Sequence, residues 1–274
     1  MKSELSVAAV GRMLNGAIIK APALFVLSIT ERKKTVNTTK FEKGNTLVVA
    51  HRGLSGIERE NTASAFVAAG NRSYYGIETD IRRTADGHFI VSHDLDLERV
   101  AGVRLNVEES TLSEAQSVIL YDKDGTKDRA DLRPCTLENY IAICKKYEKH
   151  CVLELKSEFT DDETARFIDI IKSYDYLDSV TFISFIYEDL LKVRRLLPEQ
   201  SAQYLFSTVT DEIVERVERD HLDVDVSYKA LREENIKLFH SKGIKVNCWT
   251  VDNKEAAEQL VSWGVDFITT NILE

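Results

Sequence analysis

Short apolar stretches alternate with amphipathic segments along most of the chain. The apolar stretches begin at residues 47, 76, 151, 180, 203, 222, 244 and 266, and each has the length of a buried strand. Between them, apolar residues recur at helical spacing, as in the segment 136–147. Strands that alternate with helices predict a mainly parallel sheet with helices on its outside.

The number of these units favours a closed barrel. Counting the strand starts gives eight units within about 230 residues, close to the roughly 250 residues of a (β/α)8 barrel. A doubly wound open sheet is the alternative, but it more often carries a glycine-rich phosphate loop, and neither GxGxxG nor GxxxxGK[ST] occurs. We therefore expect an α/β fold, a (β/α)8 TIM barrel, over residues 45–274.

Two segments do not fit the alternation. Residues 1–44 include an apolar run that Lys20 and Pro22 interrupt, so it is poorly suited to span a membrane. We expect an N-terminal helical arm docked on the domain. A weak membrane contact through this arm, or a signal peptide, are the alternatives. Residues 94–133 are rich in Asp, Lys and Arg and follow a hairpin after the second strand. We interpret them as a small insertion over the barrel mouth.

Polar side chains stand at the carboxyl ends of the predicted strands, where barrel enzymes have their active sites. His51 ends the first strand, Glu78 and Asp80 share one face of the second, and Glu154 and Lys156 share one face of the third. Three carboxylates that converge on a barrel axis repel one another unless a cation lies among them. Ligands that offer only oxygen favour one divalent cation, Mg or Ca.

A hairpin signal connects a histidine to these carboxylates. Asp86-Gly87 is typical of a two-residue turn between antiparallel strands. With that turn, counting back along both strands pairs Asp80 with His93. A shift of one residue would break this pairing.

The resulting set of side chains suits chemistry at phosphorus. His51 and His93 can act as general base and general acid near neutral pH. Arg52 and Lys156, together with a cation, can neutralise charge on phosphoryl oxygens. Without a glycine-rich nucleotide loop, cleavage of a phosphodiester is favoured over a kinase-like transfer.

Five short motifs in order resemble those of the glycerophosphodiester phosphodiesterase family. They are "HRG" (51–53), "ENT" (60–62), "ETD" (78–80), "HD" (93–94) and "LELK" (153–156). The similarity runs from about Leu47 to the end of the chain. It implies a (β/α)8 barrel with a small inserted subdomain that hydrolyses glycerophosphodiesters to glycerol 3-phosphate and an alcohol.

The resemblance also implies a role for each site residue. His51 and His93 become the acid–base pair, with His93 as the proton donor. Trp249 is either an apolar wall for the glycerol or a plain core residue. The remaining roles are metal ligands (Glu78, Asp80, Glu154), phosphate contacts (Arg52, Lys156) and a residue lining the mouth (Glu60).

The sequence departs from the family pattern at two positions. Arg59 stands before "ENT" where proline is frequent, which adds a positive charge near the entrance. Asn271 stands near a position where aspartate is common. Two helix starts are also expected: Asn61 as a cap after the first strand, and Asp252 with Glu255 as a capping box.

The amino-acid composition restricts the classes of molecule that the protein is expected to bind. With 36 basic and 45 acidic residues the net charge is −9, which argues against nucleic acid and for a small-molecule substrate. None of the four cysteines forms a CxxC pair, which is typical of buried thiols in a reducing, cytoplasmic compartment. Two other functions stay open: release of a lysophospholipid headgroup, of the phospholipase D type, and a non-catalytic barrel that binds a phosphorylated ligand.

Overall fold

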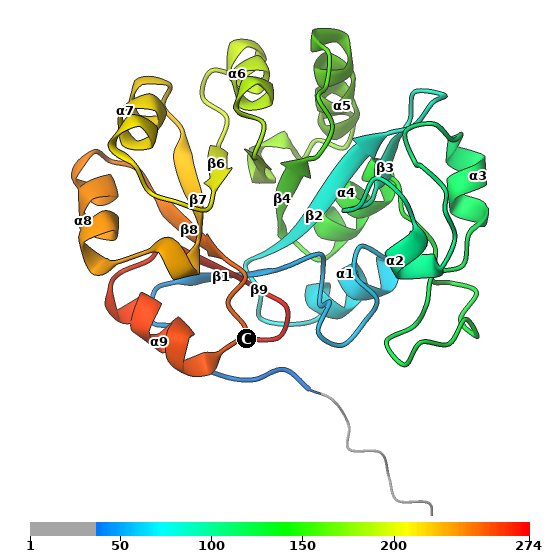
Figure 1. Ribbon diagram of the computed structural model, residues 1–274, viewed down its shortest axis with the longest axis horizontal. Helices are drawn as coiled ribbons and strands as arrows, with labels where there is room; N and C mark the ends of the chain where they lie inside the picture. Colours follow the sequence, from blue (N-terminus) through cyan, green and yellow to red (C-terminus); the bar gives the residue numbers. More distant parts are fainter. Residues whose placement is uncertain (1–36) are drawn as a thin grey trace, which may run out of the picture. The chain divides into compact units, whose positions relative to one another are not determined.

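The computed structural model describes residues 37–274, which form a closed parallel barrel (Figure 1). Each barrel strand pairs in parallel with its neighbours, and β1 pairs with both β9 and β2, so the sheet closes. The predicted (β/α)8 barrel is confirmed. Its eight strands are β1 (Leu47–Ala50), β2 (Gly76–Arg83), β4 (His150–Leu155), β5 (Val180–Ser184), β6 (Ala202–Phe206), β7 (Asp223–Ser227), β8 (Val246–Trp249) and β9 (Phe267–Thr270).

Helices lie outside the barrel and bury one face against it. In the helix predicted within 136–147, Tyr140, Ile141 and Cys144 are buried, and Tyr147 is the C-cap. Two 3-10 turns, Leu177–Ser179 and Tyr228–Ala230, complete the connections. The outer helices are α1 (Ala63–Gly70), α4 (Leu137–Lys146), α5 (Asp161–Ser173), α6 (Tyr187–Leu196), α7 (Asp211–Arg219), α8 (Glu233–Ser241) and α9 (Lys254–Ser262).

The hairpin after β2 differs from the predicted two-residue turn. Strand β3 (Phe89–Val91) runs antiparallel to β2, and the turn is closed by a hydrogen bond from Thr84 N to His88 O of 2.9 Å. Three residues, 85–87, therefore form the loop. Gly87 makes this possible because its φ of 80° lies in the left-handed region, which gives the three-residue loop with a bulge.

The longer loop shifts the register by one residue. Ser92 N donates to Asp80 O at 3.1 Å, so Ser92 and not His93 stands opposite Asp80. The predicted register was therefore wrong. His93 follows β3 instead of lying in the ladder, and it still reaches the cavity that the carboxylates line.

The segment 94–133 folds into short helices α2 (Glu98–Ala101) and α3 (Leu112–Ser117) around a small apolar core of its own. Arg59 connects it to the barrel, because its guanidinium donates to the carbonyl oxygens of Tyr121 and, at 2.9 Å, of Asp122. The Arg59 guanidinium thus anchors the insertion to the barrel through these hydrogen bonds. The buried residues of this core are Ile90 of β3 and, from the segment itself, Leu97, Val100, Ala101, Val107, Ala115, Leu120 and Leu132.

Most of the predicted N-terminal arm, residues 1–36, lies outside the described residues. The described part of it, 37–44, contains no helix; Thr39 forms a β-bridge with Leu273, and Phe41 packs into the barrel core. The four cysteines are buried and free, as predicted. Within residues 37–274, no helix combines the length and hydropathy that crossing a bilayer would need.

Candidate active site

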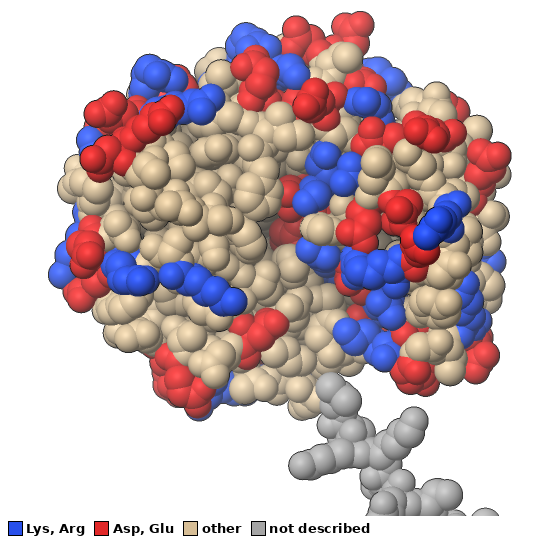
Figure 2. All heavy atoms as spheres, in the orientation of Figure 1, with Lys and Arg blue, Asp and Glu red and all other residues tan. Residues whose placement is uncertain are grey.

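A cavity of about 100 Å³ opens at the carboxyl ends of the barrel strands. Figure 2 shows acidic atoms inside a central hollow with basic atoms beside them. Charged and apolar side chains share the walls of the cavity, and they come from nearly every barrel strand. They are His51, Arg52, Glu78, His93, Glu154, Lys156, Ile183, Phe185, Leu205, Asp225, Trp249, Thr250 and Thr269.

The predicted carboxylate cluster is present. Glu78, Asp80 and Glu154 are buried, and each places one carboxylate oxygen within 4.8 Å of the others. The β2–β4 register sets Asp80 directly beside Glu154. Residue alternation and strand pairing together are enough to build this cluster.

The electrostatics of the cluster fit a divalent cation. Burial and the charge of Asp80 raise the pKa of Glu78 well above its usual value, and the same two causes raise the pKa of Glu154 to about 8. Oδ1 of Asp80 is buried and has no hydrogen-bond partner in the part of the chain that the structure describes. Without a cation this set therefore favours bound protons, whereas a hard cation would satisfy all three carboxylates.

Two positively charged side chains, those of Lys156 and Arg52, border the carboxylate cluster. Lys156 Nζ lies 3.0 Å from Glu154 Oε1 and 3.8 Å from Asp80 Oδ1. Arg52 has a left-handed φ of 54°, its backbone N–H donates to Glu78 Oε2 at 2.7 Å, and its Nε lies 3.5 Å from Asp80 Oδ2. Burial opposes ionisation of Asp80, but Arg52 and Lys156 lower its pKa. Both predicted phosphate contacts therefore stand at the cluster.

A hydrogen-bond chain fixes the orientation of His51. Its Nδ1 lies 2.8 Å from Asn271 Oδ1, while Asn271 Nδ2 donates to the Asp252 carboxylate at 2.6 Å. Because a carboxylate only accepts, the Asn271 oxygen must face His51, so His51 Nδ1 carries the hydrogen. Nε2 is then the free nitrogen, 4.0 Å from Glu78 Oε2. Burial, and next the charge of Arg52, lower the pKa of His51 to about 4, which keeps it neutral.

Asp252 is therefore not the helix cap that was predicted. Helix α9 is capped by Asn253, whose Oδ1 accepts from Ala256 N at 2.8 Å. The Asp252 carboxylate accepts instead from the backbone N–H of Asn271 at 2.8 Å and from its side chain.

His93, like His51, is oriented through a hydrogen bond of its Nδ1, but its partner is a carboxylate. Its Nδ1 lies 2.8 Å from Asp94 Oδ1, and the second oxygen of Asp94 accepts from Arg99 Nε at 2.6 Å. Burial is the main cause that lowers the pKa of His93, and the charge of Asp80 opposes it. The two histidines therefore differ: His51 donates to a neutral amide and His93 to a carboxylate.

Arg99 links both halves of the site through Glu60. Arg99 Nη2 donates to Glu60 Oε1 at 2.7 Å, and Arg52 Nη1 donates to the same oxygen at 2.8 Å. Burial opposes ionisation of Glu60, but the two arginines lower its pKa to about 2. Glu60 thus positions two arginines, and Arg99, which the sequence interpretation missed, brings the insertion into the site.

Asn61 also has a different role from the predicted cap. Thr62 caps α1, with its hydroxyl accepting from Ala65 N at 3.2 Å. Asn61 Nδ2 donates to Asp80 Oδ2 at 2.8 Å, and its Oδ1 accepts from Thr79 at 2.9 Å. Asn61 therefore orients one of the clustered carboxylates.

The opposite wall is largely apolar. Trp249 and Phe185 meet edge to face with ring centroids 5.6 Å apart. Trp249 Nε1 donates to Asp225 O at 3.2 Å, which fixes the indole at the cavity. Trp249 therefore lines the cavity, and Phe185 and Asp225 are lining residues that the sequence interpretation did not single out.

The comparisons with known proteins agree with this geometry. The model of the glycerophosphoryl diester phosphodiesterase family matches residues 51–274. The chain belongs to this family. The predicted resemblance is confirmed.

Relatives of the family cover most of the chain. A glycerophosphodiester phosphodiesterase of Bacillus subtilis is 27% identical over 91% of this chain and 94% of its own length. One from Caldanaerobacter subterraneus is 30% identical over 82% of this chain and 94% of its own length. A phosphodiesterase from Oleispira antarctica, solved with its product sn-glycerol 3-phosphate, superposes with a TM-score of 0.77 at 24% identity, covering 82% of this chain and 92% of that one.

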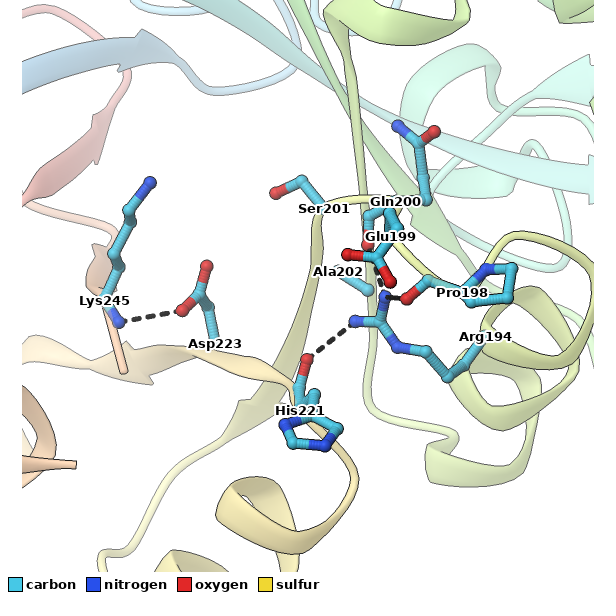
Figure 3. Close-up of a pocket in the computed structure, with 9 residues that line it drawn as sticks. All are labelled: Arg194, Pro198, Glu199, Gln200, Ser201, Ala202, His221, Asp223 and Lys245. Atoms are coloured by element: carbon cyan, nitrogen blue, oxygen red, sulfur yellow. Dashed lines mark hydrogen bonds between the residues drawn. The ribbon is translucent and has the colours of Figure 1, made fainter. Parts of the chain in front are cut away.

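A wider groove lies at the opposite end of the family barrel, beside the amino ends of β6, β7 and β8 (Figure 3). Arg194 lines this groove, and its guanidinium donates to backbone oxygens, among them His221 O at 2.7 Å. Asp223 accepts from the backbone of Lys245 at 2.8 Å. These polar groups stabilise loops, so the smaller cavity at the carboxyl ends is the candidate active site.

Proposed function

We propose that this family member hydrolyses glycerophosphodiesters to glycerol 3-phosphate and an alcohol by histidine acid–base catalysis. One observation carries the proposal: two histidines, each held through Nδ1, line the same cavity as a buried three-carboxylate cluster. Held in this way, both imidazoles have Nε2 free for the substrate.

One divalent cation, Mg or Ca, would be held by Glu78, Asp80 and Glu154. When bound, it would neutralise charge that develops on the phosphoryl oxygens. The oxygen-only donor set supports a hard cation and does not select between these two.

The positive side chains bind the phosphate. Lys156 and Arg52 stand at the edge of the carboxylate cluster and line the cavity. A phosphodiester placed there has its non-bridging oxygens within reach of both, and Arg52 is held in place by Glu60. These contacts orient phosphorus between the two histidines.

The partners of the histidines support their division of labour. Neutral His51 accepts the proton of the attacking oxygen at Nε2 while a new P–O bond forms. The P–O bond to the alcohol breaks, and protonated His93 gives its Nε2 proton to the leaving alkoxide. The Asp94 carboxylate stabilises the imidazolium of His93, whereas the Asn271 amide offers His51 no such charge.

A second substrate class has one observation in its favour. Phe185 is 45% exposed beside Trp249 at the cavity, which gives an apolar surface that an acyl chain can contact. Headgroup release from a lysophospholipid uses the same catalytic groups. A non-catalytic barrel has less support, because every proposed catalytic residue is present. The free, buried cysteines support a cytoplasmic location.

A product assay tests the proposal. Glycerophosphocholine and a lysophosphatidylcholine are incubated with the protein and magnesium, calcium or a chelator, and products are followed by phosphorus NMR. We expect glycerol 3-phosphate from glycerophosphocholine with a divalent cation and none after chelation. No product from either diester with either cation would contradict hydrolysis, and full activity after exhaustive chelation would contradict the cation.

A further inference from the structure

Strand β7 carries an aspartate into the barrel interior. Val224 and Val226 belong to the core between strands and helices, so Asp225, between them, points the other way. It is 1% exposed and lines the cavity beside Leu205.

The Asp225 carboxyl differs from the interior amide beside it in having an unpaired oxygen. Asn247, its neighbour on β8, donates to Gln203 Oε1 at 3.2 Å and accepts from Thr269 at 3.2 Å. Asp225 Oδ1, by contrast, is buried and has no hydrogen-bond partner among residues 37–274. Burying a polar group without a partner is unfavourable, so a ligand that pairs with it gains affinity.

The barrel order places Asp225 across from the phosphate contacts. In the closed sheet β7 is separated from β2 by β6, β5 and β4 on one side and by β8, β9 and β1 on the other. Strand β7 is therefore diametrically opposite β2, which carries Glu78 and Asp80. The phosphate contacts Arg52 and Lys156 follow β1 and β4, the two strands beside β2, and lie near Asp80, so a phosphodiester that they hold can extend its organic part toward Asp225.

The surroundings of Asp225 define what it can bind. Leu205, Ile183 and Trp249 offer carbon surface, and the Asp225 carboxyl is the polar group among them. A small carbon chain that bears a hydroxyl matches this wall, because a hydroxyl both donates and accepts. Lys156 Nζ lies 6.0 Å from the Phe185 ring and disfavours a cationic group on the same wall.

We propose that Asp225 is a specificity-determining residue that hydrogen-bonds a hydroxyl of the glycerol portion of the substrate. This inference rests on the proposed function, because it takes the phosphate position from it. A phosphate ester whose alcohol has no further hydroxyl leaves Asp225 unpaired and binds more weakly. The same residue thereby selects polyol phosphates over simple alkyl phosphates.

Binding of two phosphate monoesters tests this directly. sn-Glycerol 3-phosphate and propyl phosphate carry the same phosphate group on a three-carbon chain and differ only in hydroxyls. Their Kd values are measured by calorimetry, with magnesium present, for the wild type, Asp225→Leu, Asp225→Asn and the control Asp223→Asn. Asp223 is on the same strand at the other end of the barrel.

We expect the wild type to prefer glycerol 3-phosphate by about tenfold, the worth of one good hydrogen bond. Asp225→Leu should bind both esters equally, while Asp225→Asn and Asp223→Asn should keep most of the preference. If Asp225→Leu does not fold, Asp225→Ala, which also removes the carboxyl, takes its place and should likewise bind both esters equally.

An unchanged preference in the variant that lacks the polar group, Asp225→Leu or Asp225→Ala, or a wild type that binds the two esters equally, would overturn the inference. Hydrolysis is measured separately on glycerophosphocholine. A protein with the expected binding preference but no hydrolysis would defeat the proposed function and leave the Asp225 assignment standing.

Discussion

His51 Nδ1 lies 2.8 Å from Asn271 Oδ1, and Asn271 is itself held by Asp252. The amide sets the His51 tautomer without adding a charge beside it. We expect Asn271→Leu to lower kcat about 10- to 100-fold with a smaller change in KM, because an unoriented base loses catalytic efficiency. Asn271→Asp keeps an acceptor for His51 but replaces the donor to Asp252 by a second carboxylate, so it should restore kcat only in part.

Nitrogen NMR of His51 and steady-state kinetics check this prediction. In Asn271→Leu the His51 imidazole should no longer be held in the Nδ1–H tautomer and should populate both tautomers. Asn253→Ala is the control, since it removes the α9 cap at a cost of about 1 kcal/mol and leaves His51 untouched. Normal kcat in Asn271→Leu, or an equal loss in Asn253→Ala, would speak against a positioning role.

Arg99 joins the insertion to both histidine-bearing segments. It donates to Asp94, the partner of His93, and to Glu60, the partner of Arg52. We expect Arg99→Met to lower kcat/KM about tenfold, since both pairs lose a neighbour that fixes them. The check is steady-state kinetics together with a thermal unfolding curve.

Arg104→Met is the matched control for Arg99. Arg104 belongs to the same insertion, and its side chain is 84% exposed. Among the described residues it pairs only with Glu98, at the surface. The Arg104→Met variant should leave kcat and KM unchanged. The coupling is refuted if the two arginine variants behave alike.

The carboxylate cluster predicts opposite effects of Glu78→Gln on stability with and without a cation. In metal-free protein this variant removes one member of a repelling, buried set, so its Tm should exceed that of the wild type. Magnesium or calcium at about 100 times Kd should add about 2.7 kcal/mol to the wild type and far less to the variant.

Differential scanning calorimetry with and without the cation measures both effects. Glu109→Gln, an exposed acid on the insertion, serves as the control and should show the wild-type response. A cation-induced rise of equal size in the wild type and Glu78→Gln would exclude Glu78 as a ligand.

Glu274 predicts a pH-dependent stability at the chain end. Its carboxylate accepts from Ser73 N at 2.9 Å and from Thr38 Oγ1 at 2.7 Å, and it pairs with Lys40 at 2.9 Å. Burial opposes ionisation, but these contacts lower the pKa of Glu274 to about 2.

A folded-state pKa below the unfolded value stabilises the protein above the unfolded pKa, and this stability disappears as the pH falls through the folded value. Glu274→Gln should therefore cost about 1 kcal/mol at pH 7, since Lys40 is exposed and screened. The difference in urea midpoint from the wild type should shrink below about pH 4. A difference that does not change with pH would show that the carboxylate charge is not its cause.

The barrel and its carboxylate cluster were predictable from the sequence because each depends on simple periodicity. Apolar runs mark the strands, and alternation alone places Glu78 and Asp80 on one face. Asp225 carried the same signal, since alternation along β7 turns it inward, but it belongs to no motif.

The hairpin register and the helix caps were not predictable in the same way. Asp86-Gly87 allows loops of two or three residues, and the left-handed Gly87 selects the longer one only in the folded chain. Asp252 and Asn253 are both good caps by residue type, and the distant Asn271 decides between them. Arg99 acts on Glu60, 39 residues away, through an insertion without clear periodicity.

The central claim is that His51 and His93 divide one proton-transfer cycle between them. General acid–base groups contribute about 10²–10⁴-fold each, so both alanine variants should be that much slower on a natural glycerophosphodiester. The decisive measurement is kcat of His51→Ala and His93→Ala on a diester whose nitrophenolate leaving group needs no proton. This substrate should restore the rate of His93→Ala and leave His51→Ala slow. Equal rescue of both variants, or near-normal rates of either one on the natural diester, would contradict it.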